Sequence, residues 1–330
     1  MKKNWNTLKQ NYCISIKRFM KSDCVMHEKN NKNEMIGGHV GCSNRQPDSL
    51  FKKTFKFYKK LSAKSDLSSV LELHQSLPLR GVSCVPFSPV HCPSTLELSR
   101  LGLRPLNQWK LTTIKNRDGL YVLTDVFDSS RHLEWIHRAL KIYPELPSKT
   151  NISLNTSDTL EIFPRYAKKL RWVTMGLHYD WSNKTYPYEG DPIPEELSTL
   201  ANLISCSLGL KEMKADAVII NYYPPKSTLS GHIDRSERSL EKPLISLSFA
   251  QSAVYLCGGE NLDDPVDALF LHSGDVLIMH GSQRLVYHGV PLILKTRTFE
   301  TRSDIPRDII DYANFNRICI TLRQVNKTEK

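Results

Sequence analysis

From residue 216 onward the chain is a succession of short apolar runs, and this pattern constrains the fold more than any other feature. The runs that we expect to be strands are 217–223, 244–249, 252–256, 267–271, 275–280, 284–288 and 317–325. Turn-forming residues such as Gly258-Gly259 and Asp263-Asp264-Pro265 separate most of them. Short strands at this spacing are typical of a sandwich or jelly roll. The sequence therefore predicts a double-sheet β core.

Helices are expected ahead of this core. Apolar residues of 130–143 fall on one helical stripe, and a second helix is expected over 192–208. A strand is expected at 119–124, and the proline-containing segment 84–97 is interpreted as an extended linker. The fold class is thus α+β. The domains that we expect are a basic arm at 1–48, an N-terminal extension at 49–115, a helical support at 116–215 and the β core at 216–326.

The net charge of +11 is concentrated near the N-terminus. Residues 1–60 contain 14 Lys and Arg and 4 Asp and Glu, whereas the remainder of the chain is close to neutral. A basic arm suits a polyanion such as nucleic acid, and a solvated extension is the alternative. The first 22 residues contain no acid and place Trp5, Leu8, Tyr12, Ile16 and Phe19 at helical spacing. Residues 1–25 therefore resemble a mitochondrial presequence, with an untargeted tail as the alternative.

The cysteines and the hydropathy exclude several classes of protein. The eight cysteines form no C-x-x-C pair, which argues against a zinc ribbon or a thioredoxin-like site. Their scatter is typical of reduced thiols in an intracellular protein. No apolar run reaches the roughly 18–20 residues that cross a bilayer, so no membrane association is expected.

Two histidines and one aspartate are candidate metal ligands. His232 and Asp234 are two residues apart, so in an extended segment both side chains point to one side. His288 lies at the end of a predicted strand. Two imidazoles and one carboxylate form the facial triad of non-haem Fe(II) oxygenases, which leaves metal positions open. Zinc is the alternative metal, although the H-E-x-x-H helix that often binds it is absent from the sequence.

A second group of residues suits a dicarboxylate. Arg317 and Arg323 are six residues apart in a predicted strand and therefore share a face, as do Asn221 and Tyr223 in another strand. Guanidinium groups bind carboxylates in a bidentate manner. Two solvated arginines on an edge strand would give the same alternation, and a strand ending at a turn would equally explain Asn221 and Tyr223.

Several motifs together resemble the AlkB family, and most closely its eukaryotic homologue-one subfamily. They are N-Y-Y at 221–223, L-x-x-H-x-D-R-S-E at 229–237, H-S-G-D-V-L-I-M at 272–279, S-x-R-L-x-x-H-x-V-P at 282–291 and R-x5-R-Q at 317–324. The similarity extends over roughly residues 50–325. It implies a double-stranded β-helix core, flanking N-terminal helices, a nucleotide-recognition lid, Fe(II), 2-oxoglutarate as cosubstrate, and O2.

The resemblance also implies roles for individual residues. His232, Asp234 and His288 would bind iron and be catalytic, whereas Asn221, Tyr223, Arg317 and Arg323 would bind 2-oxoglutarate. Candidate substrate contacts are Trp172, Leu177, His178, Tyr179 and Ser236. The chain departs from the family at Cys319, where Asn is frequent, and at Ser236 and Leu262, where the bacterial pattern has an acid and a base. These departures argue against classical repair of alkylated duplex DNA.

Cations and aromatic side chains alternate over 165–188, which suits the binding of unpaired or flipped bases. The expected reaction is oxidative demethylation or hydroxylation of methylated bases, in tRNA or other RNA rather than in duplex DNA. A protein hydroxylase with the same iron core and a nucleic-acid-binding module with a vestigial site are the alternatives. We expect a monomer in mitochondria, the nucleus or both, with the cytoplasm as an alternative.

Overall fold

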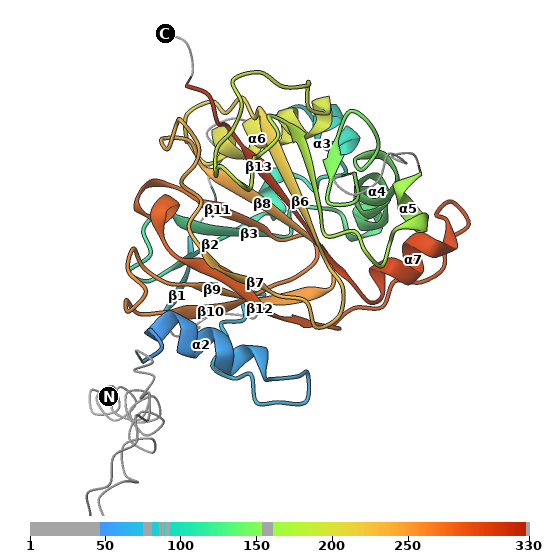
Figure 1. Cartoon of the computed structure of the whole chain (residues 1–330). Helices are drawn as coiled ribbons and strands as arrows, with labels where there is room; N and C mark the ends of the chain where they lie inside the picture. The colour runs from blue at the N-terminus through green and yellow to red at the C-terminus, as the bar shows by residue number, and fades with distance from the viewer. Residues whose placement is uncertain are drawn as a thin grey trace, which may run out of the picture. The chain divides into compact units, whose positions relative to one another are not determined.

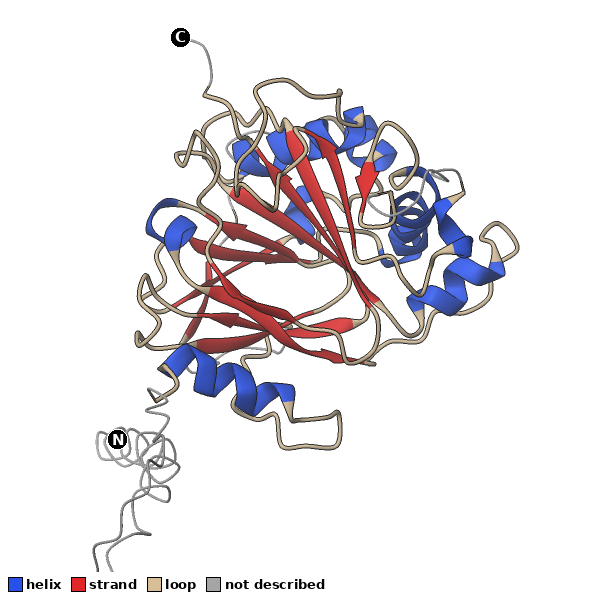
Figure 2. Ribbon diagram, in the orientation of Figure 1, coloured by secondary structure: helices blue, strands red, loops and turns tan. Residues whose placement is uncertain are grey.

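Two antiparallel sheets form the centre of the computed structural model, which describes residues 47–74, 81–85, 87, 89, 93–153 and 161–327 (Figure 2). The elements described below all belong to one unit, Asp48–Lys330. Residues 1–46 lie outside the described residues, and with them lie the expected presequence at 1–25 and all but the last two residues of the expected arm at 1–48. Within the described part of the chain, no helix is long and apolar enough to cross a membrane.

The larger sheet has nine strands in the order β1-β2-β3-β11-β8-β13-β6-β5-β4. Their bounds are Val82–Val85 (β1), Lys110–Ile114 (β2), Leu120–Thr124 (β3), Lys149–Thr150 (β4), Trp172–Gly176 (β5), Ala217–Tyr223 (β6), Leu244–Ala250 (β8), Val276–Met279 (β11) and Arg317–Arg323 (β13). The smaller sheet has the order β10-β9-β12-β7. Its strands are Leu229–His232 (β7), Ser252–Cys257 (β9), Asp267–Leu271 (β10) and His288–Leu294 (β12). The two sheets agree with the jelly-roll core that the sequence predicts.

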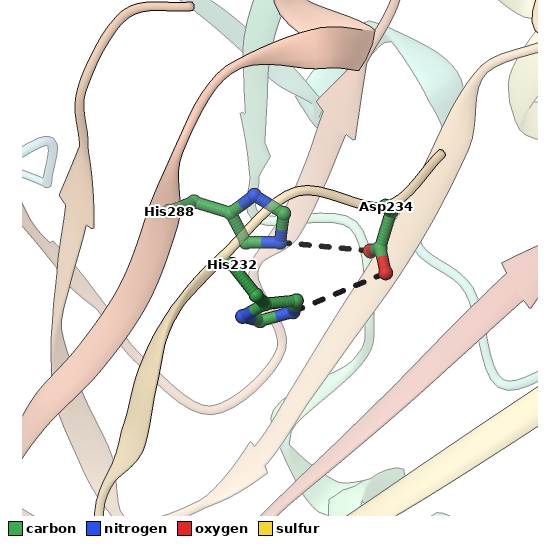
Figure 3. Close-up of side chains that lie close together, drawn as sticks. All are labelled: His232, Asp234 and His288. Carbon is green, nitrogen blue, oxygen red and sulfur yellow. Dashed lines mark ion pairs between the residues drawn. The ribbon is translucent and has the colours of Figure 1, made fainter. Parts of the chain in front are cut away.

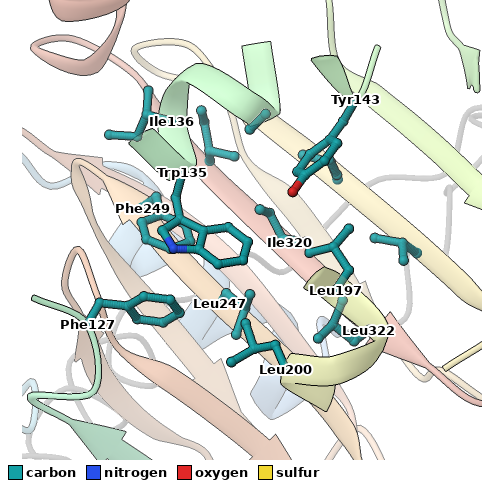
Figure 4. Close-up of a cluster of buried hydrophobic side chains, with 14 of the residues drawn as sticks. Phe127, Trp135, Ile136, Tyr143, Leu197, Leu200, Leu247, Phe249, Ile320 and Leu322 are labelled. Atoms are coloured by element: carbon teal, nitrogen blue, oxygen red, sulfur yellow. The ribbon is translucent and has the colours of Figure 1, made fainter. Parts of the chain in front are cut away.

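Helices cover the outer face of the larger sheet (Figure 1). They are α3 (Thr95–Arg100), α4 (His132–His137), a π-helical turn (Arg138–Ile142), α5 (Ile162–Arg165), α6 (Glu195–Ser207) and α7 (Arg307–Ala313). Short 3-10 turns lie at Leu106–Gln108, Ser129–Arg131 and Gly281–Leu285. Trp135 of α4 stacks on Phe249 of β8 with ring centroids 5.9 Å apart, and Leu197 and Leu200 of α6 pack in the same cluster (Figure 4). The apolar stripe that predicts the helix over 130–143 is thus buried: Leu133, Ile136 and Leu140 all lie in the core.

Helix α2 (Leu50–Lys59) packs on the smaller sheet. Ser49 caps its first turn by accepting a hydrogen bond from the backbone of Lys52. The ring of Phe51 occupies the space that side chains at two glycines would need. A Cβ atom added to Gly231 would lie 2.4 Å from this ring, and a Cβ atom added to Gly258 would lie 2.8 Å from it. Helix α2 can therefore pack closely because Gly231, in β7, and Gly258, just after β9, have no side chains.

The segment after α2 protects the free edge of the smaller sheet. Leu71 forms a parallel bridge with Leu269 of β10, the edge strand. Beyond that bridge, Glu72 pairs with His272 at 3.0 Å and His74 pairs with Asp275 at 2.8 Å. Such cover blocks the unpaired backbone groups of β10 from pairing with another strand.

Two expectations about local structure are wrong. Residues 281–285 form a 3-10 turn and the strand begins only at His288, whereas we expected a strand over 284–288. Within 84–97, expected to be a linker, β1 ends at Val85 and α3 begins at Thr95. The 3-10 turn replaces the expected strand because the buried side chain of Arg284 needs the turn to reach two backbone carbonyls. Helix α3 begins inside the expected linker because Ser94 caps its first turn.

Candidate metal centre

His232, Asp234 and His288 come together at one end of the smaller sheet (Figure 3). The last residue of β7 and the first of β12 are direct cross-strand partners, so the two imidazoles face each other with centroids 4.3 Å apart. Asp234 follows β7 by two residues and places its carboxylate 3.9 Å from His232 Nε2 and 3.5 Å from His288 Nε2. One donor atom from each residue lies within 4.8 Å of the others, which is the spacing of a three-ligand metal site.

Hydrogen bonds orient both imidazoles for a metal. His232 Nδ1 donates to the Ser230 carbonyl at 2.9 Å, and His288 Nδ1 donates to the Val286 carbonyl at 3.1 Å. Each bond fixes the proton on Nδ1 and leaves the lone pair of Nε2 facing the carboxylate. This is the usual arrangement of metal-binding histidines. The donor set of two neutral nitrogens and one carboxylate therefore fits Fe(II).

The charge states of the triad also suit a cation. Burial alone raises the pKa of Asp234, but the Arg323 guanidinium and the two imidazoles outweigh burial and hold that pKa well below its usual range. Burial, followed by the neighbouring His288, lowers the pKa of His232. An ionised carboxylate and a neutral imidazole are the forms that bind a metal.

A chain of buried charges supports Asp234 from behind. Arg323 Nη2 donates to Asp234 Oδ2 at 3.0 Å and Arg323 Nη1 donates to Glu237. Glu237 also pairs with Arg284 Nη2 at 3.2 Å, and Arg284 Nη1 donates to the backbone carbonyl of Asp234. The side chains of Glu237 and Arg284 are only 1% and 2% exposed. Both residues belong to the quoted motifs, but their role as supports depends on side-chain contacts that spacing does not show.

The strand that carries both arginines is central. β13 lies between β8 and β6 and pairs with both along most of its length. Arg317 and Arg323 are 1% and 6% exposed, so the alternative of solvated arginines on an edge strand is excluded. The guanidinium of Arg317 lies 5.2 Å from the ring centroid of Tyr223, and Asn221 is the partner of Cys319. The structure thus brings all four predicted cosubstrate residues to two adjacent strands.

Arg317 has spare hydrogen-bonding capacity. Its Nη2 donates to Ser248 Oγ at 2.9 Å, whereas its buried Nε and Nη1 have no partner among the described residues. A buried guanidinium with two free donors is costly unless an anion pairs with it. The carboxylate of 2-oxoglutarate would meet this requirement, and the site fits the cosubstrate on that ground.

The candidate substrate residues divide into two groups. Trp172 and Tyr179 contact the exposed Trp181, with ring centroids 5.6 and 4.7 Å from it, and Tyr179 Oη lies 3.2 Å from Ser236 Oγ, two residues after Asp234. Leu177 is instead buried in a small apolar cluster, and His178 is held by Thr174 and Asp191. The first group is available to a substrate beside the triad, whereas the second has little free surface.

Comparison with known proteins agrees with this geometry. Residues 119–323 match the family model described as the 2OG-Fe(II) oxygenase superfamily. The chain belongs to this superfamily. It is 32% identical over 286 residues to the human protein "Nucleic acid dioxygenase ALKBH1", which covers 78% of this chain and 74% of the human protein. Membership of the AlkB family and its homologue-one subfamily is therefore confirmed.

Other relatives match shorter parts of this 2-oxoglutarate-dependent dioxygenase. The Schizosaccharomyces pombe protein "tRNA demethylase abh1" is 45% identical over 137 residues, covering 40% of this chain and 44% of that protein. The Escherichia coli protein "Alpha-ketoglutarate-dependent dioxygenase AlkB" is 33% identical over 127 residues, which covers 37% of this chain and 57% of that protein. The solved structure of OsALKBH1 is 20% identical, covers 65% of this chain and 99% of that one, and has a TM-score of 0.45. The cofactors of this family are Fe(II), 2-oxoglutarate and O2.

Proposed function

We propose that this dioxygenase oxidatively demethylates methylated bases in nucleic acid, and that tRNA is the preferred substrate. The aromatic ledge of Trp172, Tyr179 and Trp181 supports the proposal most directly, because a hydrogen bond between Tyr179 and Ser236 holds the ledge beside the triad. Aromatic faces stack on bases that are flipped out or unpaired. Loops of RNA offer such bases without the cost of opening a duplex.

Each site residue has a defined task in this proposal. His232, Asp234 and His288 hold the iron, and Arg317 pairs with the distal carboxylate of 2-oxoglutarate, aided by Asn221 and Tyr223. Arg323 orients Asp234 and lies at the other end of the cosubstrate. Bound iron supplies the oxidising power by coupling O2 to the decarboxylation of 2-oxoglutarate to succinate. An oxidised N-methyl group then leaves the base as formaldehyde.

The segment that contains the ledge suits a phosphate backbone. Over 165–188 its exposed cations are Arg165, Lys168, Lys169, Arg171 and Lys184. The printed names of the human and S. pombe relatives refer to nucleic acid and to tRNA, which supports the same substrate class. We assign the segment 165–188 to a nucleotide-recognition lid within the expected support region 116–215. A monomer acting in mitochondria, the nucleus or both fits this function, with residues 1–25 as the targeting segment.

The proposal can be tested by mass spectrometry of tRNA nucleosides before and after incubation with the enzyme, Fe(II) and 2-oxoglutarate. We expect loss of one methylated nucleoside and release of succinate, and neither with Asp234→Ala. Trp181→Ala should slow tRNA demethylation far more than uncoupled succinate release. Phe315→Ala, which removes another exposed aromatic side chain, is the matched control. Unchanged nucleosides together with hydroxylation of a histone peptide would instead support the protein hydroxylase.

Binding of RNA hairpins gives an independent measurement. If phosphates contact the lid, the affinity should fall steeply as the salt concentration rises, with a slope that decreases when Lys168 and Arg171 are replaced by Gln. An affinity independent of salt would contradict a phosphate-binding lid.

A further inference from the structure

One cysteine lies in the middle of the candidate cosubstrate pocket. Cys319 occupies β13 between Arg317 and Arg323, and the alternation of the strand turns all three side chains to the same face. The intervening residues Ile318 and Ile320 are completely buried in the core beneath the helices. Same-face neighbours on a strand are about 7 Å apart, so an extended dicarboxylate that reaches from Arg317 toward the metal must pass over the thiol.

Cys319 is also the residue on this face of β13 that solvent can reach. β8 and β6 cover both edges of β13, and Arg317, Thr321 and Arg323 are buried on the same face. Cys319 nevertheless keeps partial exposure, as does its partner Asn221 on β6. Small molecules in the solvent can therefore reach this pair, although its neighbours on β13 are buried.

A second observation indicates that a ligand binds beside this pair. Arg317 is 1% exposed and keeps two buried donors without a partner among the described residues, two positions from the thiol. Among the described residues, the single hydrogen-bonding contact of the Cys319 thiol is a weak one, to Thr321 Oγ1 at 3.9 Å, and the side chain packs near Tyr223 and Tyr255. A carboxylate on Arg317 would lie over the sulfur, whereas the empty pocket leaves the sulfur open to small reagents.

We propose that Cys319 is a modifiable thiol within the cosubstrate pocket, that its alkylation or oxidation excludes 2-oxoglutarate, and that bound 2-oxoglutarate shields it. The inference rests on the site assignment proposed above. With iodoacetamide, the thiolate forms an S–C bond, iodide leaves and the thiol proton goes to water. With hydrogen peroxide, the sulfur attacks the O–O bond, the thiol becomes a sulfenic acid and one water is released, a two-electron oxidation that thiol reductants reverse.

The first test is differential labelling of the full chain with Mn(II) as a redox-inert stand-in for iron. A short pulse of iodoacetamide, with or without 2-oxoglutarate, is followed by unfolding, a second isotopic label and peptide mass spectrometry. At a concentration of about 100 Kd, 2-oxoglutarate should slow labelling of Cys319 by about 100-fold, because only the empty pocket reacts. Cys206, partly exposed on α6, should label equally in both samples, and the fully buried Cys257 in neither.

Calorimetric titration of 2-oxoglutarate in the same samples distinguishes failure of this inference from failure of the cosubstrate site assignment. If 2-oxoglutarate binds but Cys319 labels at the same rate with and without it, or does not label at all, this inference is wrong and the site assignment stands. If 2-oxoglutarate does not bind, the site assignment fails and takes the inference with it.

The second test measures the consequence of modification. After peroxide treatment without metal, the affinity of the wild-type chain for 2-oxoglutarate with Mn(II) should fall at least about tenfold, because the added oxygen occupies the pocket, and dithiothreitol should restore it. Cys319→Ser should show the same affinity before and after treatment, whatever its starting value. Cys206→Ser should remain as sensitive as the wild type. Equal loss in wild type and Cys319→Ser would overturn the proposal.

Discussion

Glu237→Gln offers a quantitative test of the buried charges behind Asp234, a proposed metal ligand. The substitution keeps the shape of the side chain but removes the negative charge between Arg284 and Arg323. All three side chains are at most 7% exposed, so water cannot replace the lost partner. Leaving a buried charge uncompensated costs about 3–5 kcal/mol. At about 2 °C per kcal/mol for a domain of this size, the Tm should fall by about 6–10 °C.

The measurement is thermal and urea-induced unfolding of the metal-free chain, followed by titration with Mn(II). Because the substitution leaves the site one unit more positive, we expect weaker Mn(II) binding as well as lower stability. Asp311→Asn is the control, since it breaks an ion pair whose side chains are 69% and 57% exposed and should cost less than about 1 kcal/mol. Equal losses of stability in the two variants would refute the argument that burial makes this network important.

Three further predictions concern the ligands and a buried histidine. Asp234→Ala should abolish Mn(II) binding and uncoupled succinate formation, and unchanged succinate formation would exclude the triad. Arg317→Lys should raise the KM for 2-oxoglutarate by at least about tenfold, because lysine cannot form a bidentate pair, while RNA affinity stays unchanged. Burial, with help from Arg297, lowers the pKa of His132 to about 4. Between pH 6.5 and 4 the unfolded state therefore binds more protons than the folded state. As the pH falls through this window, the free energy of unfolding should decrease by up to about 3 kcal/mol in the wild type and by less in His132→Gln, as measured by urea unfolding.

Much of the site could be predicted because its chemistry is encoded locally. A histidine and an aspartate two residues apart share a side of any extended segment, and this holds for His232 and Asp234 whatever the rest of the fold. The roles of Arg317 and Arg323 depended on context. Polar and apolar residues alternate identically in an edge strand and in a central strand that faces a cavity, and only the pairing of β13 with both β8 and β6 distinguishes the two.

The supports of the site were less accessible to prediction. Residues 284–288 alternate like a strand, but Arg284 must reach the carbonyls of Lys242 and Asp234, and the chain turns to allow it. Leu177 was a candidate substrate contact, yet it packs inward with Tyr186, Ala217 and Val325. In both cases a tertiary contact overrides the local pattern, which a sequence window does not contain.

The packing of α2 on the smaller sheet has a practical consequence for anyone who shortens the chain. Phe51 fills the space above Gly231, the residue immediately before the proposed iron ligand His232, and also lies close to Gly258. Removing α2 would expose the side of the smaller sheet against which the helix packs, next to the proposed metal ligands. A truncation meant to delete the basic arm should therefore end before Asp48, so that Ser49 still caps the helix and Asp48 still pairs with Lys52. The residues that follow are part of the catalytic body, although they look like a continuation of the lysine-rich tail.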